Sequence, residues 1–174
     1  MIPEYKFCLE EGVDDSYLPI RSEPKATGWD VRAFIDAPMV LKPFQHVLIP
    51  LGFRVFCPDG WWLELESRSS TFAKKHLNSL SGKIDQTYEG KMMFACQWLP
   101  EQHTHHEQGE GRSWNTRISA YMEYLTISPG DKLGQLIPVK LQEMLVSKVS
   151  AEEYKALCEE RNGVRGTGGF GSTG

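Results

Sequence analysis

The sequence lacks the features that mark several common classes of protein. Its four cysteines, at positions 8, 57, 96 and 158, lie far apart and form no C-x-x-C pair, so neither a zinc site nor a disulfide framework is predicted. No apolar run approaches the length that crosses a bilayer, and the N-terminus carries no basic stretch followed by an apolar one. We therefore expect reduced thiols, no membrane partner and a cytoplasmic location.

Positive charge is also in short supply. The chain has 19 Lys and Arg residues against 23 Asp and Glu, which gives a formal net charge of −4 at pH 7. Direct binding of nucleic acid is not expected, because contacts to a phosphate backbone require a basic surface. Any nucleotide site must instead be a local group of donors. With 174 residues, 40% of them hydrophobic, the chain suits one domain with a sizeable core.

Short strand-like segments separated by turn residues make up most of the chain. Segment 46–56 is rich in β-branched and aromatic residues, Pro58-Asp59-Gly60 is typical of a turn, and segment 61–67 alternates in polarity. Together these predict a hairpin. The same pattern predicts further strands at 91–99, 120–127 and 134–141, with a second turn at 129–131. Repeated short strands of this kind favour an all-β sandwich or barrel.

One helix is predicted near the C-terminus. Ser150 can act as its N-cap and Glu153 as the partner residue of a capping box. Asn162 and Gly163 are typical of a helix end.

Residues 100–119 are polar and show no periodicity. They contain His103, His105, His106 and Glu107, which could be imagined as metal ligands. Zinc ligands, however, usually sit on defined elements at recurrent spacings. We therefore interpret 100–119 as a solvated insertion loop. A protein partner at this loop stays open, because long loops are often functional.

Five segments carry polar residues that a strand-and-turn scaffold does not require: ATGWDV (26–31), SRSS (67–70), GKIDQTYEG (82–90), GDKLGQL (130–136) and RGTGGFGSTG (165–174). An arginine with two hydroxyls in the second segment suits phosphate oxygens. An aspartate near a tyrosine ring in the third suits activation of a water beside a sugar. Read singly, the second and third have plainer interpretations as an ST-turn and a turn-capping aspartate.

The last segment has the spacing G-x-G-x-x-G at Gly166, Gly168 and Gly171. A dinucleotide-binding turn with this spacing lies between a strand and a helix, and here no helix follows. Composition alone therefore favours a flexible terminus.

Taken together and in this order, the five segments closely resemble the five motifs of the trimeric dUTPase family, the dUTP nucleotidohydrolases. GKIDQTYEG is similar to the family pattern G-x-I-D-x-D-Y-x-G, GDKLGQL to G-D-R-x-x-Q-L, and the glycine-rich segment ends the chain. The resemblance implies an all-β distorted barrel or jelly roll over residues 1–163 and a flexible C-terminal arm over 164–174. It also implies a homotrimer with sites at the subunit interfaces, and Mg²⁺-dependent hydrolysis of dUTP to dUMP and pyrophosphate.

The resemblance further implies roles for single residues. Asp85 takes the place of the water-activating carboxylate, Tyr88 would lie against the deoxyribose, and Asp30 would bind Mg²⁺ through water. The uracil edge would be bound by the backbone around Ser79, Leu80, Gly82, Lys83, Ile84 and Met93. The phosphates would be bound by Arg68, Ser69, Ser70 and Gln135. The arm would add Arg165 at the γ-phosphate, Phe170 stacked on uracil, and donors from Gly169, Gly171, Ser172 and Thr173.

The match departs from the family pattern at a few positions. Ser67 stands where proline is usual, Thr87 where a second aspartate is common, Glu89 where arginine often sits, and Lys132 where the fourth motif has arginine. The span from Asp85 to the fourth motif is longer than in compact members by roughly twenty residues, as in some phage-encoded dUTPases. A host cytoplasm would then be the location.

Two alternatives remain at this point. One is a dCTP deaminase of the same fold, which would need a catalytic glutamate where this chain has Ala95. The other is a nucleotide-binding regulatory protein that acts through the insertion. The sequence also leaves open whether the arm closes the site of its own subunit or of a neighbour.

Overall fold

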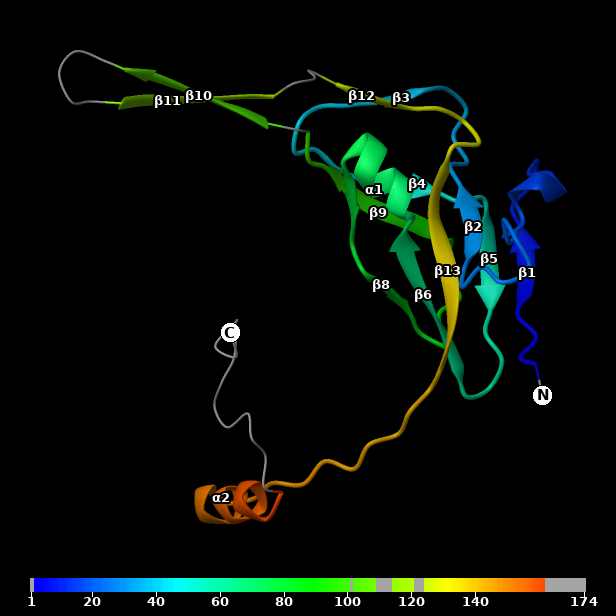
Figure 1. Ribbon diagram of the computed structural model, residues 1–174. Coiled ribbons are helices and arrows are strands. Elements are labelled where there is room, and N and C mark those ends of the chain that lie inside the picture. Colours follow the sequence, from blue (N-terminus) through cyan, green and yellow to red (C-terminus); the bar gives the residue numbers. More distant parts are fainter. Residues whose placement is uncertain (1, 101, 109–113, 121–123, 162–174) are drawn as a thin grey trace. The chain divides into compact units, whose positions relative to one another are not determined.

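The strands form five sheets in the computed structural model, which describes residues 2–100, 102–108, 114–120 and 124–161 (Figure 1). The strands are β1 (Lys6–Leu9), β2 (Trp29–Arg32), β3 (Met39–Leu41), β4 (His46–Pro50), β5 (Phe53–Phe56), β6 (Trp61–Ser67), β7 (Leu77–Ser79), β8 (Gly82–Ile84), β9 (Met93–Trp98), β10 (Gln102–Gln108), β11 (Trp114–Ala120), β12 (Leu125–Ile127) and β13 (Lys132–Lys140). The helices are α1 (Ser69–Lys75), α2 (Ala151–Glu160) and a 3-10 turn, η1 (Asp15–Tyr17).

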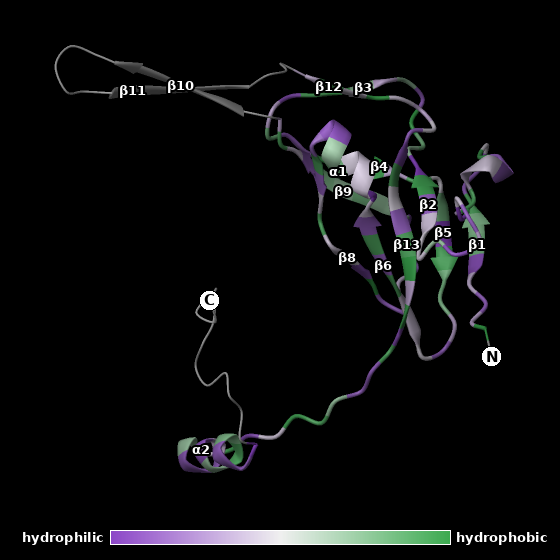
Figure 2. Cartoon of the chain, viewed as in Figure 1, coloured by the Kyte–Doolittle hydropathy of each residue, from purple (hydrophilic) through white to green (hydrophobic). Residues whose placement is uncertain are grey.

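Two of the sheets supply most of the core. The larger has the strand order β2-β13-β6-β8 and the smaller β4-β9-β7, all with antiparallel pairs. Burial alternates along β6, where Leu63 and Leu65 are buried, and along β9, where Phe94, Cys96 and Trp98 are buried. Hydrophobic residues (green) recur along these strands in Figure 2. Buried residues of both sheets join one hydrophobic cluster, so the predicted all-β, jelly-roll-like fold is confirmed.

The predicted hairpin between segments 46–56 and 61–67 is wrong. The first segment breaks at Gly52, which has a φ of +80°. A Cβ added to Gly52 would lie 2.9 Å from the Phe34 ring, so this position excludes a side chain. The turn at Pro58-Asp59-Gly60 does form, but β5 pairs with β1 while β6 pairs with β13 and β8. Alternation identifies a strand without identifying its partner, because either neighbour buries the same face.

Helix α1 was not predicted from the sequence. It covers only seven residues, SSTFAKK, and among them only Thr71 is buried. It ends at His76, which has a left-handed φ of 50° and donates its N–H to the carbonyls of Phe72 and Thr71. A helix this short offers too few turns for a 3.6-residue apolar pattern.

The polar segment 100–119 contains a β-ribbon where a loop was expected. Strands β10 and β11 pair antiparallel from Gln102↔Ala120 to Gln108↔Trp114. The predicted strand 120–127 is also divided, since Ala120 ends β11 and β12 begins at Leu125. Backbone pairing does not require apolar alternation, which is why composition alone did not indicate these strands.

The chain divides into two compact units, residues 1–141 and 142–174. Helix α2 lies in the second of these units. The expected domain over 1–163 stays a prediction. The capping box of α2 is confirmed, because Ser150 Oγ accepts the Glu153 N–H at 3.1 Å and Glu153 Oε2 accepts the Ser150 N–H at 2.7 Å. The expected helix end at 162–163 and the arm at 164–174 lie outside the described residues. Within those residues, no helix is both long and apolar enough to span a membrane.

Candidate functional site

Asp30 on β2 lies at the centre of a group of polar side chains, and only 1% of its surface is exposed. Its Oδ1 lies 3.0 Å from Arg68 Nε and accepts a hydrogen bond from Gln135 Nε2 at 3.1 Å. Its Oδ2 accepts a hydrogen bond from Lys132 Nζ at 2.8 Å. We call Asp30, Arg68, Lys132 and Gln135 the Asp30 cluster. Three polar segments that are far apart in the sequence thus meet at one carboxylate.

A β-bulge in β13 allows Lys132 and Gln135 to reach the same carboxylate. Residues three apart in a regular strand point to opposite faces. Here Lys132 pairs with Arg32 and Gly134 with Val31, so Leu133 is an extra residue without a partner on β2. Gln135 then pairs directly with Asp30. Lys132 was noted in the sequence only as a departure from the family pattern; Gly134 inside a strand was the one indication of a bulge.

Two glycines let the strands of the cluster approach each other. A Cβ added to Gly28 would lie 2.8 Å from Gln135 Cβ. A Cβ added to Gly134 would lie 2.7 Å from both the Glu66 carbonyl oxygen and the Phe94 ring. Side chains at these two positions would therefore push β13 away from its neighbours and move Gln135 relative to Asp30.

The cluster has a surplus of positive charge. Arg68 and Lys132 bring two cations to the single carboxylate, and their side chains remain 26% and 31% exposed. Burial raises the pKa of the Asp30 carboxyl, but hydrogen bonds from Lys132 and Gln135 and the charge of Arg68 outweigh burial and hold the pKa below its ordinary value. Asp30 is therefore ionised at neutral pH, and the exposed cations suit an anionic ligand.

Helix α1 places the two expected phosphate-binding serines beside the cluster in the chain. Arg68 is the N-cap residue of α1, and Ser69 and Ser70 are its first two residues. The far end of the helix is held by an ion pair of 2.5 Å between Lys75 and Asp131. The segment SRSS is thus a strand-to-helix junction and not the ST-turn that its composition alone favours.

The expected base and the expected sugar-contacting ring lie in the loop after β8. Asp85 is exposed, and its carbonyl accepts the Tyr88 N–H at 3.0 Å in a tight turn. The Tyr88 ring folds over Gly90, where an added Cβ would clash with the hydroxyl oxygen, and that hydroxyl donates to the Lys91 carbonyl at 3.0 Å. Tyr88 remains 42% exposed, so one side of the ring is free for a ligand.

The residues expected to bind the uracil edge are divided between two sheets. Ser79 pairs with Cys96 on β9, and the Leu80 N–H donates to the Ala95 carbonyl at 2.9 Å. Gly82, Lys83 and Ile84 instead form β8, which pairs with β6. Met93 is on β9 but pairs with Pro50 of β4. The Lys83 side chain contacts Glu64 and Ser81, so only its backbone is available for a base.

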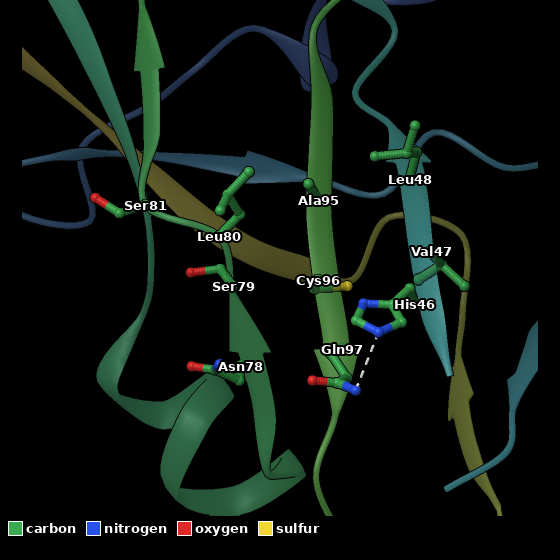
Figure 3. A pocket seen from close by; sticks show the side chains of 10 residues that line it. All are labelled: His46, Val47, Leu48, Asn78, Ser79, Leu80, Ser81, Ala95, Cys96 and Gln97. Atoms are coloured by element: carbon green, nitrogen blue, oxygen red, sulfur yellow. Dashed lines mark hydrogen bonds between the residues drawn. The ribbon is translucent and has the colours of Figure 1, made fainter. Parts of the chain in front are cut away.

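A cavity of about 470 Å³ lies over strands β4, β9 and β7 (Figure 3). Leu48 and Leu80 stand on either side of Ala95, and His46 and Gln97 form a hydrogen bond of 3.2 Å. Ser79 and Leu80, two of the residues expected to bind uracil, also line this cavity. The short methyl side chain of Ala95 leaves no carboxylate at the position where a deaminase would need one.

The described part of the chain does not join all the expected site residues. Arg68 and Gln135 both contact Asp30, and the Ser79 hydroxyl accepts the Ser67 N–H at 3.0 Å. Within the described residues, no hydrogen bond or ion pair links Asp85 or Tyr88 to the Asp30 cluster. The expected arm residues, Arg165, Gly169, Phe170, Gly171, Ser172 and Thr173, lie outside the described part.

The same part of the chain contains no group of three or more His, Cys, Asp or Glu side chains that could hold a metal ion. Asp30 Oδ1 has two nitrogen partners, whereas Oδ2 has one and keeps an acceptor position. A carboxylate in such cationic surroundings is not a preformed metal cage.

Comparison with known proteins finds relatives that match nearly the whole chain. No protein-family model matches the chain. The deoxyuridine 5′-triphosphate nucleotidohydrolase of Bordetella pertussis is 30% identical over 161 residues, which cover 91% of this chain and 89% of the relative. The enzyme of the same name from Methylibium petroleiphilum is 31% identical over 160 residues, covering 90% of this chain and 88% of the relative.

Solved structures with the same fold include two phage proteins. A mutant dUTPase of Staphylococcus bacteriophage 80alpha, with dUpNHpp, superposes with a TM-score of 0.71 at 22% identity and covers 98% of each chain. The dUTPase from phage phi11 of S. aureus, described with a species-specific insert, has a TM-score of 0.64 at 24% identity and covers 84% of this chain and 96% of its own.

Proposed function

The chain belongs to the deoxyuridine 5′-triphosphate nucleotidohydrolase (dUTPase) family and is a dUTP diphosphatase, and from this premise we propose that Asp85 activates the water for dUTP hydrolysis. The observation that carries the proposal is the position of Asp85. It is an exposed carboxylate on a loop held by hydrogen bonds, next to a half-exposed tyrosine ring. Asp85 would orient the water and accept its proton as the oxygen attacks the α-phosphorus. The bond from that phosphorus to the bridging oxygen breaks, which gives dUMP and pyrophosphate.

The Asp30 cluster supports binding of the triphosphate. Arg68 and Lys132 keep exposed donor surface, while their link to Asp30 fixes where their charge lies. Ser69, Ser70 and Gln135 would donate further hydrogen bonds. Arg165, Ser172 and Thr173 of the arm would complete the phosphate shell, with backbone donors from Gly169 and Gly171. A positive group of this kind acts mainly by positioning and by stabilising charge in the transition state.

Base and sugar selection would come from the segments around the loop. Backbone groups at Ser79, Leu80, Gly82, Lys83, Ile84 and Met93 would bind the uracil edge. Mismatched cytosine donors would leave buried polar groups unpaired, and a narrow backbone slot would exclude the thymine methyl. Tyr88 would lie against the deoxyribose and exclude a 2′-hydroxyl, and Phe170 would stack on the base. Ala95 carries no carboxylate, which disfavours the deaminase alternative.

The donor set fits a magnesium ion that is carried on the triphosphate, not one held by the protein alone. Mg²⁺ keeps several waters and prefers phosphate oxygens, so a single outer carboxylate suffices. Asp30 would accept hydrogen bonds from those waters through Oδ2, its less occupied oxygen. When bound, the ion would neutralise phosphate charge and orient the chain of phosphates.

A homotrimer with shared sites is part of the proposal. The Asp30 cluster and the Asp85 loop have no mutual hydrogen bond or ion pair among the described residues, as expected if they serve different sites. In a shared site, the loop of one subunit would face the cluster of another, and an arm would close it.

We also propose a second role for the insertion, as a contact for a protein partner. Strands β10 and β11 form a separate two-stranded sheet and pair with each other alone within the described residues. Their outer edges therefore carry backbone groups without strand partners, which suits addition of a further strand. This role would coexist with catalysis.

Pyrophosphate release from dUTP, dCTP, dTTP and UTP in the presence of Mg²⁺ tests the mechanism. We expect release from dUTP alone, and loss of at least about a thousandfold in kcat for Asp85→Asn, because an amide cannot accept the proton. An Asp85→Asn variant that retains most of its turnover would rule out the proposed base. If dUTP binds to the unaltered protein without being cleaved, the regulatory alternative replaces the mechanism.

A further inference from the structure

We propose that Gln86 is a positioning residue that fixes the Asp85 loop, defined here as residues 85–91, for catalysis. The proposal rests on the role assigned to Asp85 above. Gln86 occupies the position directly after this aspartate, where the family pattern specifies no residue type.

The Gln86 side chain clamps the loop to the turn between β5 and β6. Its Oε1 accepts the Gly60 N–H at 3.0 Å, and its Nε2 donates to Asp59 Oδ1 at 2.9 Å. Both ends of the amide are therefore in use. A flipped amide would place donor against donor at Gly60 and acceptor against acceptor at Asp59, so only one orientation satisfies the pair.

The turn that receives the clamp is itself well defined. The Trp61 N–H donates to the Pro58 carbonyl at 3.1 Å, and Gly60 has a φ of +75°. Strand β6 then runs into the larger sheet, where it pairs with β13 and β8. Gln86 thus ties a surface loop to a point at the end of a central strand.

Part of this loop borders a cavity, and hydrogen bonds hold it there. A cavity of about 530 Å³ is lined by Gln86, Tyr88 and Glu89 on the loop side and by Arg54 and Phe56 on the β5 side, among others. Asp85, Thr87 and Glu89 are exposed. A loop over a hollow moves more readily than one packed on a core, so its few polar anchors set its position.

The other anchors act on the far half of the loop. Arg54 Nη1 donates to the Glu89 carbonyl at 3.4 Å, the Tyr88 hydroxyl donates to the Lys91 carbonyl, and Lys91 Nζ donates to Glu10 Oε2 at 2.5 Å. Within the described residues, Gln86 is the only side chain among residues 85–87 that makes a hydrogen bond. Gln86 is therefore the side-chain anchor of the half that carries the proposed base, beside the backbone bond from the Tyr88 N–H to the Asp85 carbonyl.

Loss of this clamp should affect the chemical step more than binding. A general base must stay within hydrogen-bond reach of its water, and a displacement of about 1 Å can cost on the order of a hundredfold. The proposed phosphate contacts come from the Asp30 cluster, from Ser69 and Ser70 and from the arm, and none of them involves the clamp. We therefore expect kcat to fall while KM changes little.

The first experiment compares two glutamine-to-alanine variants by steady-state pyrophosphate release from dUTP. For Gln86→Ala we expect kcat to fall by about tenfold or more with KM within about threefold. Gln45→Ala is the matched control, because Gln45 Oε1 also accepts a turn N–H, that of Lys42 at 2.9 Å, but in a different turn. The control should lose comparable thermal stability and keep its kcat. Equal kcat values for both variants would overturn the proposal.

A second pair of variants tests the hydrogen-bond geometry itself. Gln86→Glu places a carboxylate against Asp59, so kcat should fall at least as far as in Gln86→Ala. Adding Asp59→Asn supplies an amide N–H, and the carboxylate at position 86 can accept a hydrogen bond from it. The hydrogen bond from the Gly60 N–H is kept. We expect this double variant to recover at least about tenfold in kcat. A double variant no better than Gln86→Glu would contradict the clamp.

Asp85→Asn in the same assay separates the two proposals. If it retains turnover, the assignment of the base has failed and Gln86 loses its stated purpose. If it is inactive while Gln86→Ala matches the unaltered enzyme, the base stands and only the positioning role is wrong.

Discussion

A buried carboxylate is stable only if its partners replace the water it has lost. Asp30 meets this condition with three side chains, one from α1's N-cap and two from β13. Asp30 in turn fixes the side chains of Arg68 and Lys132, because both form ion pairs with its carboxylate. Removing the Asp30 charge would leave Arg68 and Lys132 in a partly buried site without their counter-charge.

Asp30→Asn should therefore lower the free energy of unfolding by about 1–3 kcal/mol at pH 7. The pKa of Asp30 is lower in the folded protein than in the unfolded chain, so its stabilising contribution is present above the unfolded pKa and is lost as pH falls through the folded pKa. Urea unfolding between about pH 7 and pH 2 measures the difference between the variant and the unaltered protein. The difference should shrink below about pH 4, and one that stays constant down to pH 2 would contradict the ionised cluster.

Among the strands, β13 contributes the most side chains to the Asp30 cluster. It supplies Lys132 and Gln135, pairs with β2 on one side and β6 on the other, and contains the bulge at Leu133. Gly134 next to the bulge lies against Glu66 and Phe94, so the strand can take this course only without a side chain there.

Gly134→Ala should therefore cost about 1–3 kcal/mol of folding stability through overpacking. It should also lower kcat/KM for dUTP, because β13 must shift with Lys132 and Gln135. Gly12→Ala is a suitable comparison: Gly12 has a φ of +79° with no atom within 4 Å of an added Cβ, so only backbone strain results. Thermal unfolding should show a loss in both variants, while kinetics should show a loss only in Gly134→Ala. Equal kcat/KM values for Gly134→Ala and Gly12→Ala would show that the course of β13 at the bulge does not affect the site.

Local patterns in the sequence predicted some of the elements, namely β4, β5, β6, β9, β12, β13 and α2, but few of their contacts. Alternation located β6 and β9, and the Ser150–Glu153 spacing located α2 with its capping box. Strand partners did not follow, because pairing depends on distant segments. Helix α1 and strands β10 and β11 were missed, since one is short and the others are polar.

The candidate site divides in the same way. The resemblance of the five segments to the dUTPase motifs placed Asp30, Arg68 and Gln135 in one site, and the structure brings them into contact. The contributions of Lys132 and Gln86 could be recognised only in the structure. Lys132 depends on a register shift, and Gln86 on a turn twenty-six residues away. Neither leaves a periodic pattern in the sequence.

For the molecule as a whole, the proposed trimer would bring the Asp85 loop of one subunit to the Asp30 cluster of another. Within the described residues, no polar contact joins the Asp85 loop to the Asp30 cluster. Exposed apolar side chains on the strands, such as Leu48 at 63% and Phe56 at 63%, are also available for burial between subunits. Both observations are those expected of a subunit whose sites are completed by other copies.

Mixed oligomers test this directly. Asp85→Asn and Arg68→Ala chains should each be inactive alone, yet a mixture unfolded and refolded together should recover activity. If each site takes Asp85 from one subunit and Arg68 from another, random mixing in equal amounts gives about one quarter of the sites both intact groups. Pyrophosphate release after co-refolding measures this fraction, and sedimentation gives the number of subunits. A mixture as inactive as its components would place both groups in one chain.

The bulge at Leu133 makes the site sensitive to length as well as to residue type. Inserting one residue after Gly134 would keep every polar side chain of the cluster, yet it would shift the register by one residue and turn Lys132 away from the face that carries Gln135. Two sequences could then agree at all four cluster positions and differ in whether those positions meet. For this strand, a one-residue gap in an alignment carries more functional information than a substitution.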